Sequence, residues 1–239
     1  KQRKQGFQLN QAPLIECISI QLSEDTYKFI LNYHHIILDG WSSAILIKEV
    51  LSLYMAEERG ETFYLPTPRP YRDYIAWLNS QDKETAVESW RRTMQGFSAP
   101  NHLPVDKLQY QNQQQDSFYH KELELLLSAE VNRKLQDIGK KYHVTLSTIV
   151  QAAWALLLSR YSGEQDVVFG VTVSGRPGSL SGVENIVGLF TNTLPLRLQI
   201  SPQQQLIPWL EQIQKLMLQL QHYSYAPLAE IQGNSELSG

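Results

Sequence analysis

The sequence of 239 residues has only one cysteine and little net charge. A single cysteine, Cys17, excludes an internal disulfide and is typical of a reducing compartment, so we expect a cytoplasmic protein. Because Cys17 stands in an apolar, strand-like run, we expect it to be a small buried residue and not a nucleophile. The net charge of −3 provides no general basic face for phosphate groups, and nucleic acid is therefore not an expected partner.

Long apolar runs are also missing. None reaches the roughly 18 residues that a membrane-spanning helix needs, so we expect no membrane association. The basic residues at 1–5 are followed by no hydrophobic segment, unlike those of a signal peptide. The chain begins without methionine and stops abruptly at Gly239, and we expect it to be an internal piece of a longer protein.

Hydrophobic periodicity predicts the elements of the first part of the chain. Apolar residues favour strands over 13–22 and 27–33, and the turn residues between them predict a hairpin. Helical spacing follows over 41–59, with Ser42 as the expected N-cap and Gly60 as the stop. The hairpin therefore leads directly into a long amphipathic helix.

Helices and strands alternate again beyond an irregular stretch at 97–116, in which the polar tract 111–115 is a candidate linker. The remaining expected helices cover 71–77, 83–95, 129–142, 146–162 and 206–221. The expected caps are Asp82 for 83–95, Ser128 for 129–142 and Thr145 for 146–162. The remaining expected strands cover 118–125, 166–173 and 191–200. This pattern predicts an α/β or α+β protein in two lobes, 1–96 and 97–239, with a boundary within about 80–116.

Two adjacent histidines, His34 and His35, follow the second predicted strand directly. If the strand continues through them, their side chains point to opposite faces and cannot both reach one substrate atom. Two structural histidines are one interpretation, because histidine is often half-buried without a chemical role. A metal site would need further ligands at suitable spacing, and only Asp39 is near enough, so no metal is expected.

Asp39 and Gly40 stand between the histidines and the long helix. A buried aspartate needs a cationic partner, so an ion pair that holds the loop is the simplest role for Asp39. Arg176, in a glycine-rich loop, is one candidate partner, and an arginine outside this sequence is another.

The heptad His-His-Ile-Ile-Leu-Asp-Gly at 34–40 resembles the HHxxxDG motif of the condensation domains of non-ribosomal peptide synthetases. Further stretches resemble motifs of that family in the same order. They are Tyr71-Arg-Asp-Tyr-Ile-Ala-Trp77, Ser174-Gly-Arg-Pro177, Val187-Gly-Leu-Phe-Thr-Asn-Thr-Leu-Pro-Leu-Arg197 and, loosely, His222-Tyr-Ser-Tyr-Ala-Pro-Leu228. In the last stretch, Ser224 and Leu228 stand where the family has Asp and Phe.

The resemblance covers nearly the whole chain but leaves out the first two motifs and the last motif of the family. An Arg-His-Glu-x-Leu-Arg segment and an Arg-Asp-x-Ser-Arg-Asn-Pro-Leu segment are both missing. We therefore expect an internal fragment of a condensation domain that lacks both ends and carries only part of the substrate tunnel.

The resemblance implies a fold like that of chloramphenicol acetyltransferase, with two lobes of mixed sheets flanked by helices and a tunnel between them. It implies amide formation between a carrier-bound acyl or peptidyl thioester and the amine of a carrier-bound aminoacyl thioester. The expected partners are donor and acceptor peptidyl carrier domains and an adjacent adenylation domain in a multidomain chain. Phosphopantetheine arms would belong to these carriers, and no cofactor is expected to bind the domain directly.

The resemblance also implies roles for individual residues. His35 is the expected catalytic residue, acting as a general base or as a hydrogen-bonding group that positions the amine, with His34 as a structural neighbour. Asp39 would hold the loop through its ion pair. Gly40 would allow a tight turn close to the tunnel, where its N–H is a candidate oxyanion donor. Candidate tunnel or substrate-binding residues are Trp41, Ser174, Arg176 and Asn192; residues expected to pack between the lobes are Tyr71, Asp73 and Trp77.

Other members of the same fold are alternatives. Epimerization domains share HHxxxDG but carry Val-Gly-Trp-Phe-Thr where this chain has Leu189, and heterocyclization domains replace the histidine motif with Asp-x-x-x-x-Asp. Free-standing acetyltransferases usually keep one histidine. A non-catalytic condensation-like module that recruits a tailoring enzyme usually loses the second histidine or the glycine, and this chain has both His35 and Gly40. The sequence therefore favours a condensation domain.

Overall fold

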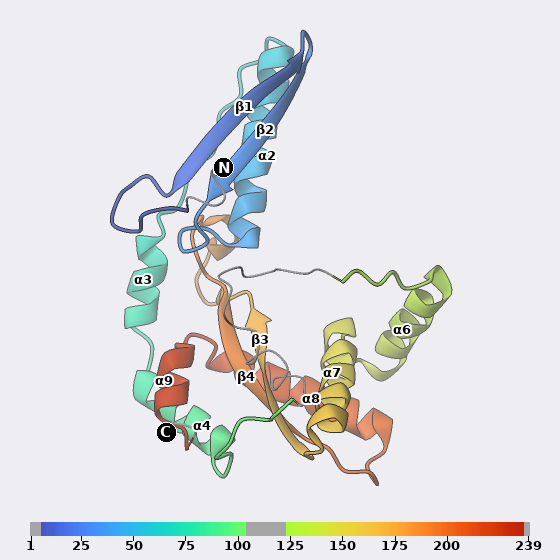
Figure 1. Cartoon of the computed structure of the whole chain (residues 1–239). Coiled ribbons are helices and arrows are strands. Elements are labelled where there is room, and N and C mark those ends of the chain that lie inside the picture. Colours follow the sequence, from blue (N-terminus) through green and yellow to red (C-terminus); the bar gives the residue numbers. More distant parts are fainter. Residues whose placement is uncertain (1–5, 104–122, 237–239) are drawn as a thin grey trace, which may run out of the picture. The chain divides into compact units, whose positions relative to one another are not determined.

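The computed structural model describes residues 6–103 and 123–236, which group into two compact units (Figure 1). Unit 1 consists of Lys1–Gln81 and Ser174–Thr191, and unit 2 of Asp82–Val173 and Asn192–Gly239. Each unit combines helices with one antiparallel strand pair, in agreement with the expected α+β composition. The grouping differs from the predicted lobes at 82–96 and 174–191, and the two lobes stay a prediction about the complete fold.

The predicted hairpin opens unit 1. Strands β1 (Ile15–Ser23) and β2 (Thr26–Tyr33) pair antiparallel, with Ile15 opposite Tyr33 and an irregularity between Gln21 and Ser23. The other elements of this unit are α2 (Gly40–Glu58), α3 (Arg72–Asn79) and the short 3₁₀ helix η2 (Val183–Asn185).

An apolar groove of about 210 Å³ lies between the hairpin and α2. Its lining includes Cys17 and Phe29 from the hairpin and Ile47 and Val50 from α2. The expected burial of Cys17 is wrong, because its side chain faces this groove and no described residue fills it, so that Cys17 is exposed.

Helix α2 begins with a different cap from the one predicted. Its N-cap is Asp39, whose Oδ1 accepts a hydrogen bond of 2.8 Å from the N–H of Ser42. Ser42 lies inside the helix, and its hydroxyl bonds to the backbone of Gly188. The predicted stop is confirmed: the helix ends at Glu58, and Gly60 follows with φ of 67°.

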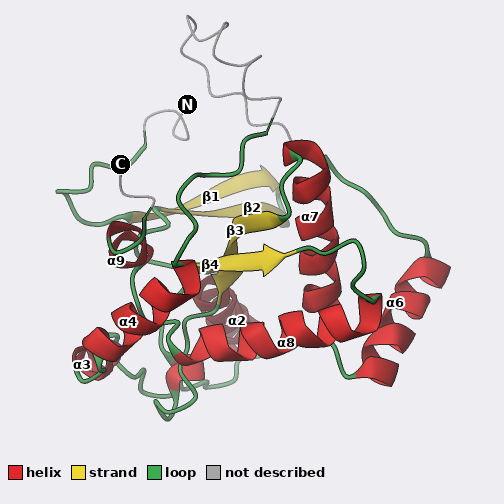
Figure 2. Ribbon diagram, turned by 90° about the horizontal axis from the view of Figure 1, so that it is seen from below, coloured by secondary structure: helices red, strands yellow, loops and turns green. Residues whose placement is uncertain are grey.

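Unit 2 contains the antiparallel pair β3 (Asp166–Val173) and β4 (Asn192–Gln199), in which Asp166 lies opposite Gln199; α7 packs against β3, and α8 and α9 pack against β4 (Figure 2). The predicted caps Asp82, Ser128 and Thr145 are confirmed, since each side chain accepts a hydrogen bond from a backbone N–H three residues later. The elements of unit 2 are α4 (Lys83–Met94), α6 (Ala129–Tyr142), α7 (Leu146–Ser162), β3 (Asp166–Val173), β4 (Asn192–Gln199), α8 (Leu206–His222) and α9 (Leu228–Gly233).

Unit 2 differs from the sequence prediction at one expected strand and at one helix. Of the strand predicted over 118–125, residues 118–122 lie outside the described part, and 123–125 are not in a strand; α9 was not predicted. Among the described helices, none taken singly has the length and apolarity to cross a membrane. The pair α6 and α7 passes only when joined, with a bend of 106° between its members.

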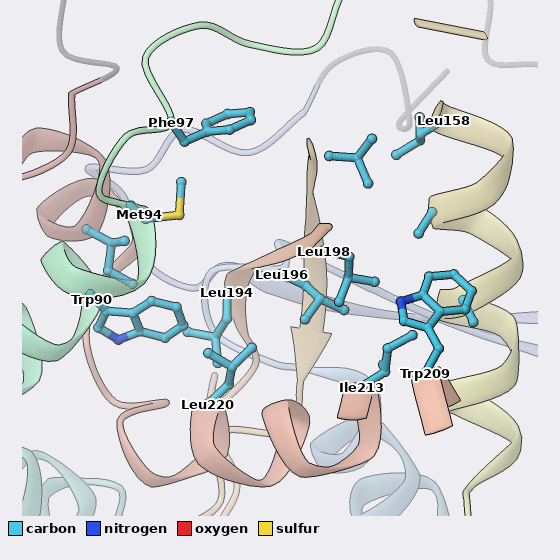
Figure 3. Close-up of a cluster of buried hydrophobic side chains, with 14 of the residues drawn as sticks. Trp90, Met94, Phe97, Leu158, Leu194, Leu196, Leu198, Trp209, Ile213 and Leu220 are labelled. Carbon is cyan, nitrogen blue, oxygen red and sulfur yellow. The ribbon is translucent and has the colours of Figure 1, made fainter. Parts of the chain in front are cut away.

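The main hydrophobic core belongs to unit 2 (Figure 3). Leu194, Leu196 and Leu198 alternate along β4, so that all three share one face of the strand. Each is at most 4% exposed, and they form one cluster with Trp209 and Ile213 from α8. Alternation on the strand and helical spacing on α8 thus produce a single apolar layer.

Candidate functional site

The two histidines lie in a turn and not on a strand. Strand β2 ends at Tyr33, and the turn at 34–37 is closed by a hydrogen bond of 3.2 Å from the N–H of Ile37 to the carbonyl of His34. The expectation based on strand alternation is therefore wrong in its premise. Local bonding distinguishes the two side chains instead.

His34 is half-buried, and its Nδ1 accepts a hydrogen bond of 3.1 Å from the N–H of Ile36. Its ring also meets Phe7 edge-on, with 6.5 Å between the ring centroids. His35 is exposed, and its side chain makes no hydrogen bond or ion pair to any described residue. The arrangement leaves the imidazole of His35 accessible, while His34 holds the turn.

Asp39 is the buried anchor of this loop, with 1% of its surface exposed. Its Oδ1 accepts from Ser42 N–H, and its Oδ2 accepts from Phe190 N–H at 3.1 Å. Burial opposes ionisation of Asp39. However, the hydrogen bonds from Ser42 and Phe190, together with the charge of Arg176, outweigh burial and lower the pKa of Asp39 below its ordinary value of 3.8.

Arg176 is the ionic partner of Asp39. Its Nη2 lies 3.5 Å from Asp39 Oδ1, which confirms the predicted ion pair and selects Arg176 among the candidates. The side chain is 4% exposed, and its guanidinium carbon lies 3.9 Å from the ring centroid of Phe190. Nη1 donates to the carbonyls of Val183 and Ile186. These contacts describe a buried brace within unit 1, and a role of Arg176 in substrate binding stays a prediction.

The Tyr71–Trp77 stretch contacts residues of the segment 179–190. The hydroxyl of Tyr71 donates to the carbonyl of Leu189, and its ring meets Phe190 edge-on at 5.2 Å. Trp77 Nε1 donates to Ser179 Oγ at 3.2 Å. These contacts lie inside unit 1, where the structure brings together three motifs that are far apart in the sequence. A contact of α3 between the lobes stays a prediction.

Gly40 does not provide the tight turn that was expected. It is the first residue of α2, its φ lies outside the left-handed region, and a Cβ built there would meet nothing within 4 Å. The turn role is therefore wrong, because helical geometry accepts any residue at this point. The close approach of Gly40 to a substrate stays a prediction.

The remaining candidates have separate surroundings. Trp41 is 53% exposed, and its Nε1 donates to the carbonyl of Glu184 at 2.9 Å. Ser174 is exposed. Asn192 belongs to unit 2, where its Nδ2 donates to the carbonyls of Ser224 and Ala226. Substrate contacts of Trp41, Ser174 and Asn192 stay predictions.

Besides the turn role of Gly40, the expected capping role of Ser42 is wrong. Ser42 is fully buried and bonds to Gly188, far along the chain. The local signal that was available is Asp39 directly before a helical pattern, which fits an aspartate cap as well as a serine cap. Among the residues that the structure describes, no group of three or more His, Cys, Asp or Glu side chains is placed to hold a metal ion.

Comparison with known proteins extends over the whole chain. The Condensation domain family matches residues 1–239. One curated relative, a linear gramicidin synthase protein of Brevibacillus parabrevis, is 43% identical over 235 residues, which are 98% of this chain and 5% of that protein. Another, bacitracin synthase 3 of Bacillus licheniformis, is 37% identical over 235 residues, which are 98% of this chain and 4% of that protein.

Solved structures give the same fold. The first condensation domain of the CDA synthetase has a TM-score of 0.72 at 22% identity, over 90% of this chain and 47% of that one. The X-domain from teicoplanin biosynthesis has a TM-score of 0.74 at 20% identity, over 98% and 53%. This chain thus spans about half the length of these two solved chains. The expected chloramphenicol acetyltransferase-like fold is confirmed, and the chain belongs to the condensation-domain family of non-ribosomal peptide synthetases.

Proposed function

We propose that this chain carries the reactive histidine of a domain that joins two carrier-bound substrates through an amide bond. The donor is an acyl or peptidyl thioester, and the acceptor is the amine of an aminoacyl thioester. The observation that supports this proposal most is the family match over 1–239, together with an accessible His35 beside the buried Asp39–Arg176 pair.

The reaction mainly requires that the acceptor amine be positioned next to the thioester carbonyl. The acceptor amine attacks the thioester carbonyl, a C–N bond forms, the C–S bond breaks, and the thiol leaves with the proton that the amine loses. An α-amino group has a pKa of about 8, so part of it is neutral and nucleophilic near neutral pH. The exposed imidazole of His35 accepts the amine proton or holds the amine by a hydrogen bond.

The neighbours of His35 have supporting roles in this proposal. His34 fixes the turn through its bond to Ile36, and Asp39 fixes the start of α2. Gly40 carries the first backbone N–H of α2, which would stabilise negative charge on the carbonyl oxygen of the tetrahedral intermediate. Trp41, Ser174, Arg176 and Asn192 are the proposed contacts along the substrate path.

The partners follow from the substrates. Donor and acceptor carrier domains would deliver thioesters on phosphopantetheine arms, and an adenylation domain in the same multidomain chain would load the acceptor. We place the reaction in the cytoplasm, in keeping with the single cysteine.

The test compares His35→Ala with His34→Asn in the full-length protein. Amide formation between loaded donor and acceptor carriers is followed by mass spectrometry of the product. His35→Ala should lose most of the rate. His34→Asn should retain it, because the Oδ1 of asparagine can accept the Ile36 N–H in place of Nδ1. Normal product formation by folded His35→Ala would contradict the assignment.

A non-catalytic recruitment module is the second candidate. The observation in its favour is the similarity to the teicoplanin X-domain, which has also been solved in complex with OxyB. At 20% identity this similarity concerns the fold alone. The same carrier assay distinguishes the two functions, since a recruitment module would bind partners without forming amide product. An epimerization domain would instead invert the donor, which chiral analysis of the bound thioester detects.

A further inference from the structure

Ser42 uses the full hydrogen-bonding capacity of its hydroxyl. Its Oγ donates to the carbonyl of Gly188 at 2.7 Å and accepts from the N–H of the same residue at 3.0 Å. It also accepts from Arg176 Nη2 at 3.0 Å. A hydroxyl has one donor and two acceptor sites, so all three are occupied. Ser42 is also 0% exposed, and water therefore cannot replace a bond that is lost.

Gly188 is held between Ser42 and the ring of Tyr71. A Cβ built on Gly188 would lie 2.1 Å from Tyr71 Cδ2, so the ring occupies the space where any other residue would have its side chain. The two bonds to Ser42 satisfy both backbone groups of Gly188. The backbone of this segment has little freedom to move while both contacts persist.

These hydrogen bonds form a closed circuit that links the start of α2 to residues 188–190. Ser42 bonds to Gly188, Phe190 donates its N–H to Asp39, and Asp39 accepts the N–H of Ser42. The turn that carries His35 leads directly into this circuit of hydrogen bonds. The position of the turn therefore depends on the hydroxyl of Ser42 as well as on the ion pair.

We propose that Ser42 is a positioning residue for the amide-forming reaction: its hydroxyl ties the first turn of α2 to Gly188 and thereby sets the position of His35. This inference rests on the proposed function, in which His35 acts on the acceptor amine. Ser42 acts through the loop and touches no substrate. A displacement of a reacting group by about 1 Å can lower a rate about a hundredfold, and a loss of this order is expected when the hydroxyl is removed.

The experiment uses Ser42→Ala in the full-length protein, with Ser52→Ala as the matched control. Ser52 lies on the same helix, and within the described ranges its hydroxyl bonds only to the carbonyl of Lys48, at 2.8 Å. The rate of amide formation is measured against the concentration of loaded acceptor carrier. We expect kcat to fall about a hundredfold in Ser42→Ala with little change in KM, whereas Ser52→Ala should behave like the wild type.

Hydrogen exchange separates positioning from general loss of structure. In Ser42→Ala, the peptides that cover 34–42 and 186–190 should exchange faster, because the N–H of Gly188 has lost its acceptor. Peptides from β1 and β2 should be unchanged. Wild-type kcat in Ser42→Ala would overturn the proposal, and so would faster exchange throughout unit 1. If Ser42→Ala does not fold, Ser42→Cys replaces it, because a thiol has a similar shape and forms weaker hydrogen bonds. Wild-type kcat and wild-type hydrogen exchange in Ser42→Cys would equally overturn the proposal.

His35→Ala in the same assay distinguishes a failure of the proposed role of Ser42 from a failure of the proposed role of His35. If it abolishes product while Ser42→Ala keeps wild-type kcat, only the role of Ser42 is wrong. If folded His35→Ala keeps wild-type kcat, the proposed function of His35 is wrong, and the positioning role falls with it.

Discussion

Replacing Asp39 with asparagine tests the buried anchor of the histidine turn. Both carboxylate oxygens accept a backbone N–H, Oδ1 from Ser42 and Oδ2 from Phe190. An amide offers only one oxygen, so in either orientation its NH₂ group faces an N–H donor. The change also removes the negative charge beside Arg176, whose side chain is only 4% exposed. Asp39→Asn therefore leaves a buried N–H donor without an acceptor and a buried cation without its counter-charge, although Arg176 keeps its hydrogen bonds to uncharged groups.

The size of the effect follows from these two losses. Removing one partner of a buried ion pair costs about 3–5 kcal/mol, and a buried unsatisfied N–H costs about 1–3 kcal/mol. The two costs share the same groups and are not additive, so we expect a total of about 3–5 kcal/mol. That is a large part of the 5–15 kcal/mol, approximately, by which a native protein is stable.

Urea denaturation of the full-length protein near neutral pH, with hydrogen exchange of α2 as the local probe, measures this loss. Asp82→Asn is the matched control, because Asp82 caps α4 at an exposed position and asparagine caps about as well as aspartate. Arg176→Met, alone and combined with Asp39→Asn, completes a double-mutant cycle. The double variant should lose less than the sum of the single losses. Additive losses, or an Asp39→Asn variant as stable as Asp82→Asn, would refute the reasoning.

Three further predictions concern pH and packing. Because the pKa of Asp39 is lowered from 3.8, its contribution to stability is complete above that value and is lost as pH falls through the folded-state pKa; urea midpoints of wild type and Asp39→Asn should therefore converge in acid. Gly188→Ala should lower the melting temperature, because its Cβ would lie 2.1 Å from Tyr71 Cδ2, whereas Gly178→Ala meets nothing within 4 Å and should be nearly neutral. Leu196→Ala, at a position with 0% exposure, should cost about 2–5 kcal/mol in urea denaturation.

Local chemistry was sufficient to predict many of the elements. The hairpin follows from short-range alternation, and the caps Asp82, Ser128 and Thr145 each bond to an N–H only three residues away. In such cases the partners lie within one turn of the helix. The sequence window therefore contains both groups that decide where the element begins.

Long-range bonds explain what the sequence could not predict. Ser42 was expected to cap α2, but its hydroxyl bonds to Gly188, which is 146 residues away, and Asp39 became the cap instead. No local pattern specifies that pairing, because the position of Gly188 depends on the ring of Tyr71. The same reason explains why residues 174–191 group with unit 1, although the order of elements placed them in the second lobe.

The geometry assigns chemistry and structure to different residues of one heptad. His35 is exposed in a turn, whereas Asp39 is buried and fully bonded. A change at His35 should therefore lower the rate of the proposed reaction while leaving stability unchanged, because no described partner loses a bond. A change at Asp39 should lower stability first and the rate only through displacement of the turn. The same ratio of rate loss to stability loss in both substitutions would mean that the heptad acts as one structural unit. The assignment of a separate chemical role to His35 would then lose its support.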